Sequence, residues 1–152
     1  MVSPNMTTQF KIVCLDDFPT VDRWSRESEY FYFEKGILEY LNDGWSLKGQ
    51  LSLDKEGVTC AQNIIRNTNN KSNINKYKII SGGVGSGEAG LTSSQHDKVL
   101  SNFSNLVNEH LSKGWELYGD CIMRPKRKLE YGGRYIQVVI KRSPQAEVNL
   151  LD

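Results

Sequence analysis

The chain contains a ten-residue motif twice, seventy residues apart. Residues 41–50 read LNDGWSLKGQ and residues 111–120 read LSKGWELYGD. The identical positions are Leu41, Gly44, Trp45, Leu47 and Gly49, which return as Leu111, Gly114, Trp115, Leu117 and Gly119. A chain of 152 residues can bury one good core or two small cores that support each other. The repeat therefore indicates a duplicated supersecondary unit.

A helical pattern precedes each Gly-Trp pair. Large apolar residues recur there at a spacing of four: Phe33, Ile37 and Leu41 in the first copy, and Phe103, Val107 and Leu111 in the second. Residues at this spacing share one face of a helix. We expect each helix to end at the glycine of the pair, because glycine adopts the left-handed conformation that a helix C-terminus needs.

Three short segments in each copy read as strands, because they are rich in β-branched and aromatic residues. They are residues 10–13, 46–53 and 59–66 in the first copy, and 77–80, 116–123 and 134–142 in the second. The order of elements predicts an α+β fold of two tandem β-α-β-β units with pseudo-two-fold symmetry. Each unit has an antiparallel sheet covered by a helix, so two copies can cover each other. The predicted divisions are unit one at 1–66, a polar linker at 67–76, unit two at 77–142 and a tail at 143–152.

The tryptophan of each motif stands at the corner between helix and strand. A large ring at such a corner can lie against both the helix and the sheet. We favour this packing role over the alternative, a stacking surface for a planar ligand.

The second unit resembles small bacterial and viral domains of unknown function with a helix, a Gly-Trp-Glu-Leu-x-Gly signature, and a last strand carrying a glutamine and a basic end. The matching residues are Tyr77, Gly114, Trp115, Glu116, Leu117, Gly119, Gln137 and Lys141. The first unit is a divergent copy, with Ser46 where the signature has glutamate. The resemblance implies the β-α-β-β fold and occurrence in bacteria or their phages. It implies no activity and no catalytic residues.

Composition narrows the class of protein. The net charge is +1, which argues against a generally polyanion-binding surface, and no apolar run is long enough to span a bilayer. The first ten residues lack the pattern of a secretory signal. Three widely spaced cysteines, Cys14, Cys60 and Cys121, fit free thiols in a reducing compartment. A cytoplasmic protein without membrane contact is expected.

Two motifs suggest enzyme chemistry but do not support it. Gly85-x-Gly87-x-x-Gly90 follows a strand, yet the unit continues into antiparallel strands and not into the parallel unit of a dinucleotide fold. We interpret residues 82–90 as a flexible glycine loop, or as a loop that closes over an anionic ligand. The only histidines are His96 and His110, and neither belongs to a metal-binding or triad pattern. No catalytic residue, metal site or cofactor is predicted, and the protein is expected not to be an enzyme.

The strongest binding signal is a basic stretch in the second unit. Between Arg124 and Arg142 there are seven basic residues and one acidic residue. Cations suit phosphates and aromatic faces suit bases, so the stretch has the composition of an anion-binding hairpin. The candidate ligand contacts are Arg124, Lys126, Arg127, Lys128, Tyr131, Arg134 and Tyr135. A solvated basic hairpin without a ligand is the open alternative.

Three functions follow as hypotheses. The first is a non-enzymatic module that captures a small anionic, nucleotide-like ligand, and the family resemblance implies that a phage could encode it. The second is a protein-interaction module, such as an inhibitor of a host protein, and the third is a weak binder of RNA or single-stranded DNA. Because unpaired edge strands invite association, a homodimer is also expected.

Overall fold

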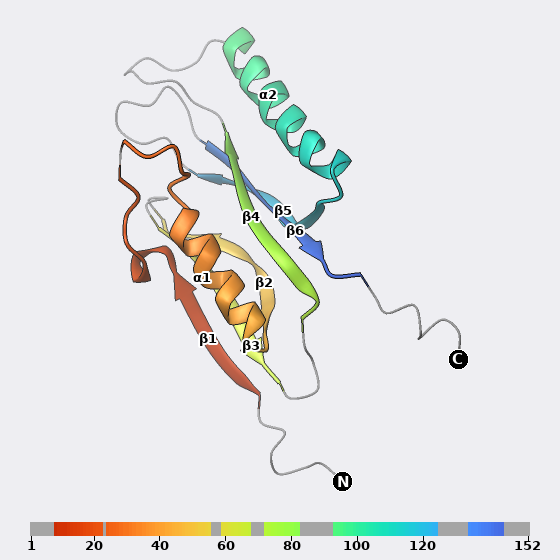
Figure 1. Cartoon of the computed structure of the whole chain (residues 1–152). Coiled ribbons are helices and arrows are strands. Elements are labelled where there is room, and N and C mark those ends of the chain that lie inside the picture. Colours follow the sequence, from red (N-terminus) through yellow and green to blue (C-terminus); the bar gives the residue numbers. More distant parts are fainter. Residues whose placement is uncertain are drawn as a thin grey trace, which may run out of the picture.

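The computed structural model describes residues 8–22, 24–55, 59–67, 72–82, 93–124 and 134–144, with only the backbone described for residues 93–96 (Figure 1). In this part of the chain the elements are β1 (Gln9–Cys14), the short 3-10 helix η1 (Leu15–Asp17), α1 (Phe31–Asn42), β2 (Trp45–Leu53), β3 (Cys60–Arg66), β4 (Ile74–Gly82), α2 (Ser93–Ser112), β5 (Glu116–Arg124) and β6 (Arg134–Arg142).

The strands form two antiparallel sheets of the same design. Sheet 1 has the order β1-β3-β2 and sheet 2 has the order β4-β6-β5, so the last strand of each unit lies in the centre. α1 follows β1 and α2 follows β4, which gives the order β-α-β-β twice. The predicted α+β fold of two tandem units is confirmed.

The helices follow the apolar pattern of the sequence. In α1, Phe33, Ile37 and Leu41 are all buried, and the helix ends two residues before Gly44, whose φ is 90°. In α2, Phe103 is buried, and Gly114 follows the helix with a φ of 92°. Because β4 already begins at Ile74, regular structure starts inside the segment 67–76 that was expected to be a linker.

A bulge with a glycine interrupts the second strand of each unit. Gly49 in β2 and Gly119 in β5 both have a φ of 71°, and the register with the central strand shifts at these points. The bulged carbonyl oxygens accept hydrogen bonds from the central strand. Gln62 Nε2 lies 2.9 Å from the oxygen of Gly49, and Gln137 Nε2 lies 3.1 Å from that of Gly119. These aligned glutamines therefore satisfy backbone groups that the sheet leaves unpaired.

Each sheet has a helix-side face, which carries the helix of its own unit, and an outer face. The main core lies between the helix-side face of sheet 1 and the outer face of sheet 2. Val13 and Ile64 contribute from the first unit, and Ile79 and Val138 from the second, all almost fully buried. A smaller cluster around Phe103 joins α2 to the helix-side face of sheet 2. β4 accordingly lies between α1 and α2 (Figure 1).

Unlike faces of the two units thus meet in this core. The layout of two tandem units matches the expectation from the repeat, and the structure adds that the contact itself is front to back, not a pairing of like faces. Hydrogen bonds reinforce it at two edges. Tyr118 Oη donates to the oxygen of Gly49 at 2.9 Å, and the amide of Ile79 in β4 donates to Glu34 Oε2 of α1 at 2.5 Å.

Candidate ligand-binding groove

The basic stretch is only partly described. Four of its predicted ligand contacts, Lys126, Arg127, Lys128 and Tyr131, fall outside the described residues. The other three lie at its base, where Arg124 of β5 is paired with Arg134 of β6, and Tyr135 follows.

These three side chains pack into the protein. Arg124 is buried, and Arg134 and Tyr135 are half-buried. Arg134 Nη1 lies 3.4 Å from Ser81 Oγ, and the ring of Tyr135 lies 5.9 Å from that of Phe103. These three side chains, at the base of the hairpin, are therefore less exposed than we expected for ligand contacts.

The positive charges of both arginines act on the buried Tyr30. Burial raises the pKa of Tyr30 well above its usual range, while the positive charges of Arg124 and Arg134 lower it. Tyr30 directly precedes α1, so the two arginines belong to the contact between the units.

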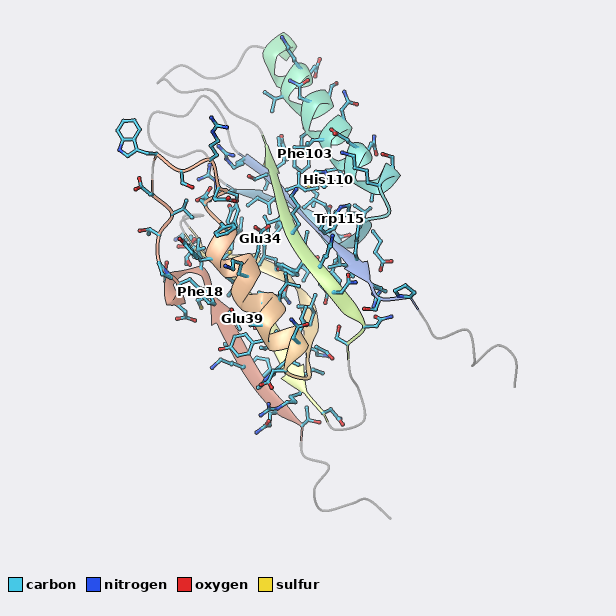
Figure 2. All side chains as sticks on the ribbon, viewed as in Figure 1. Phe18, Glu34, Glu39, Phe103, His110 and Trp115 are labelled. Atoms are coloured by element: carbon cyan, nitrogen blue, oxygen red, sulfur yellow. The ribbon has the colours of Figure 1, made fainter. Side chains whose placement is uncertain are left out.

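A separate groove runs between α1 and β4. Its volume is about 400 Å³, within the range of small-molecule sites. The lining residues are Phe31, Glu34, Lys35 and Leu38 from α1, Asn75, Lys76, Tyr77 and Lys78 from β4, and Trp115, which precedes β5. In Figure 2, Glu34 and Trp115 lie on opposite sides of β4. The groove combines apolar walls with exposed lysines.

Trp115 is the largest aromatic surface in this groove. Its ring is half-buried, and two ammonium groups lie near it, Lys141 Nζ at 5.2 Å and Lys78 Nζ at 6.0 Å from the ring centroid. The imidazole of His110 contacts it edge-on, with 6.0 Å between ring centroids. On the opposite wall, Lys35 Nζ lies 5.3 Å from the centroid of Phe31. Each wall thus pairs an aromatic ring with a cation.

The equivalent corner in the first unit is closed. Trp45 is only 8% exposed, and it packs against Tyr40 with 6.0 Å between ring centroids. The guanidinium of Arg66 lies 4.8 Å from the centroid of Trp45, where Lys141 stands over Trp115. Both tryptophans therefore pack at a corner, as expected. Trp115 also lines the groove between α1 and β4.

Glu34 lies in the groove wall as a carboxyl held against the edge of sheet 2. Burial raises the pKa of Glu34 to about 7, although the hydrogen bond from the amide of Ile79 and the positive charge of Lys78 both lower it. The negative charge of Glu27 adds a smaller upward effect. Near neutral pH the groove therefore carries less negative charge than its sequence suggests.

Sequence reasoning missed most of this groove. It singled out Trp115 from the repeat, with a stacking surface as the less favoured role, and Tyr77 and Lys141 through the signature. It did not connect them with Lys78, Phe31 or Glu34. One available signal was the alternation Lys76-Tyr77-Lys78, which places both lysines on the same face of a strand. The approach of α1 to β4 depends on how the units pack, which the repeat does not specify.

Other predicted features contribute little here. The glycine loop predicted at residues 82–90 lies outside the described part of the chain except for Gly82, where β4 ends. His110 Nδ1 lies 2.8 Å from the carbonyl oxygen of Leu106 in its own helix. The three cysteines are free thiols. Within the described ranges, histidines, cysteines and carboxylates nowhere gather in groups of three or more that would hold a metal ion.

Comparison of the chain with protein-family models, with curated proteins and with solved structures finds no match. The resemblance to the Gly-Trp-Glu-Leu-x-Gly domains therefore stays a prediction. None of the described helices is long and apolar enough to cross a membrane.

Proposed function

We propose that this protein is a non-enzymatic binding module that captures a small, planar, anionic ligand of nucleotide type in the groove between α1 and β4. The observation that carries the proposal is the half-exposed ring of Trp115 with the ammonium groups of Lys78 and Lys141 beside it. An aromatic face with adjacent cations offers stacking for a base and charge for its phosphates.

The surroundings of the ring support the same ligand class. Lys35 and Lys76 add two exposed cations along the groove, and Phe31 offers a second aromatic surface. The raised pKa of Glu34 reduces its repulsion of a nearby anion, because a protonated carboxyl carries no charge. The basic hairpin residues Lys126, Arg127, Lys128 and Tyr131 remain predicted contacts of a larger anion.

The test is a thermal-shift and titration series with AMP, ATP, GTP, two cyclic dinucleotides and an oligothymidylate. A nucleotide that binds should raise the melting temperature and quench the fluorescence of Trp115. The variant Lys78→Ala/Lys141→Ala should weaken that binding at least about tenfold, since it removes two charge contacts. The matched control Lys55→Ala/Lys98→Ala removes the same charge from residues outside the groove, and it should bind as the wild type does.

Rival sites and functions give different results in this series. If Lys126→Ala/Arg127→Ala/Lys128→Ala abolishes binding and Lys78→Ala/Lys141→Ala does not, the site is the hairpin and the groove proposal is wrong. Binding of the oligonucleotide alone, with a steep salt dependence, would favour the single-strand binder. If no probe binds, while a pull-down from bacterial lysate captures a protein at the groove, the protein-interaction function is favoured.

A further inference from the structure

The two units can be compared position by position, because they share one fold. Phe10 and Ile12 on β1 correspond to Tyr77 and Ile79 on β4, and both pairs lie on the outer faces of their sheets. Tyr77 and Ile79 are each 3% exposed, because the outer face of sheet 2 packs against the first unit. Phe10 and Ile12 are 59% and 52% exposed. The outer face of sheet 1 is thus the uncovered version of a face that the second unit buries.

The helix-side surfaces differ in the opposite sense. In the first unit, Leu47 and Leu53 on β2 pack against the main core under sheet 2. Their equivalents on β5, Leu117 and Met123, are 52% and 64% exposed. On the helices, Ile37 is fully buried whereas its equivalent Val107 on α2 is half-buried. The helix-side surface of the second unit is therefore the more exposed counterpart of the surface that, in the first unit, packs against sheet 2.

We infer that a second copy of this chain stacks front to back on the first, with its outer face of sheet 1 over the α2 and β5 side of the other copy. The core between the units already joins an outer face to a helix-side face, and each copy keeps one unused surface of each kind. Scattered exposed apolar residues need no explanation, but here Phe10 and Ile12 occupy positions that are buried in the internal contact, and Leu117 and Met123 occupy positions that are half-buried in it.

The stacking contact joins unlike surfaces, so it is heterologous. Such contacts close into rings or continue as chains. The outer face of sheet 1 is less apolar than that of sheet 2, because Ala61 and Asn63 stand where sheet 2 has Ile136 and Val138. The association is therefore weaker than the internal contact and depends on protein concentration.

Two double variants test the contact. Phe10→Asp/Ile12→Asp blocks the outer face, and Leu117→Asp/Met123→Asp blocks the helix-side surface. Light scattering over a hundredfold range of concentration should show that the wild type grows beyond the 17.3 kDa of one chain and that each double variant does not. An equimolar mixture of the two variants should form a species of two chains, because each supplies the surface that the other lacks. Circular dichroism establishes that the variants are folded. If a double variant does not fold, the single variants Ile12→Asp and Leu117→Asp take the place of the two double variants.

The mixture separates this contact from other modes of association. Like-to-like pairing through β1 would be lost in the outer-face variant but would persist in the helix-side variant alone, which keeps Phe10 and Ile12. The control Trp24→Asp/Tyr32→Asp alters two exposed aromatic residues outside both surfaces and should associate as the wild type does. A wild-type mass of one chain at every concentration, or a mixture that stays at one chain, overturns the inference.

Discussion

The side-chain amide of Gln62 donates a hydrogen bond to the carbonyl oxygen of Gly49, with 2.9 Å between the two atoms. Gln62 also accepts a hydrogen bond from the hydroxyl of Tyr77 at 3.1 Å, and the same glycine oxygen accepts one from Tyr118 at 2.9 Å. Gln62 thus sits in a polar network that connects the bulge of the first unit with two strands of the second. Gln137 donates to the carbonyl oxygen of its own bulge at Gly119, and also to the backbone oxygens of Tyr118 and Val138, which belong to sheet 2.

This difference predicts unequal costs of removing the two glutamines. Gln62→Ala should lower the free energy of unfolding by about 2–4 kcal/mol. It removes the acceptor of the Tyr77 hydroxyl and one of the hydrogen bonds to the carbonyl oxygen of Gly49, both in the core. Gln137→Ala should cost about 1–2 kcal/mol. Tyr77→Phe removes one hydroxyl and should cost about 1 kcal/mol. Urea unfolding of the three variants measures this, and equal losses for both glutamines would contradict the network.

The two bulge glycines offer a matched pair. Both have a φ of 71°, so an alanine at either position should lose about 1 kcal/mol from the left-handed conformation. A Cβ at Gly49 would meet open space, whereas a Cβ at Gly119 would lie 2.8 Å from Gln50 Cβ. Gly119→Ala should therefore cost an additional 1–3 kcal/mol or so by pushing β2 away from β5. The double variant Gly119→Ala/Gln50→Gly should recover most of the steric part, and a failure to recover it would argue against this contact.

The two tryptophans should differ in the same kind of measurement. Trp45 is buried beneath Tyr40 and Arg66, so Trp45→Ala should cost about 3–5 kcal/mol. Trp115 keeps part of its ring in a groove, and Trp115→Ala should cost clearly less. Thermal unfolding of both variants gives the comparison. A loss at Trp115 as large as that at Trp45 would assign its ring to packing and weaken the case for a ligand there.

The repeat predicted the element order of both units, because apolar spacing and glycine positions depend on local structure. It could not predict which faces meet, since that depends on contacts between residues distant in the chain, such as Tyr77 with Phe33 and Gln62. For the same reason the burial of Arg124 went unforeseen. A basic stretch reads as solvated in a sequence, whereas the fold leaves Arg124 only 1% exposed.

Glu34 should make stability depend on pH. Its pKa is about 7 in the folded protein, against an ordinary value of 4.5 that the unfolded chain should retain. Between these values the folded protein binds more protons than the unfolded chain. The free energy of unfolding should therefore fall as pH rises from about 4.5 to about 7, by up to about 3 kcal/mol, and this contribution should be constant above pH 7 or so.

The variant Glu34→Gln isolates this effect. Its amide oxygen can still accept the hydrogen bond from the backbone of Ile79, but it has no charge to desolvate. The stability of Glu34→Gln relative to the wild type should increase as pH rises from 5 to 7, because only the wild type has to ionise a buried carboxyl. Glu39→Gln, at an exposed position of the same helix, is the matched control and should follow the wild type throughout. Parallel pH profiles for Glu34→Gln and the wild type would show that the carboxyl is solvated, and the groove would then carry a full negative charge at neutral pH.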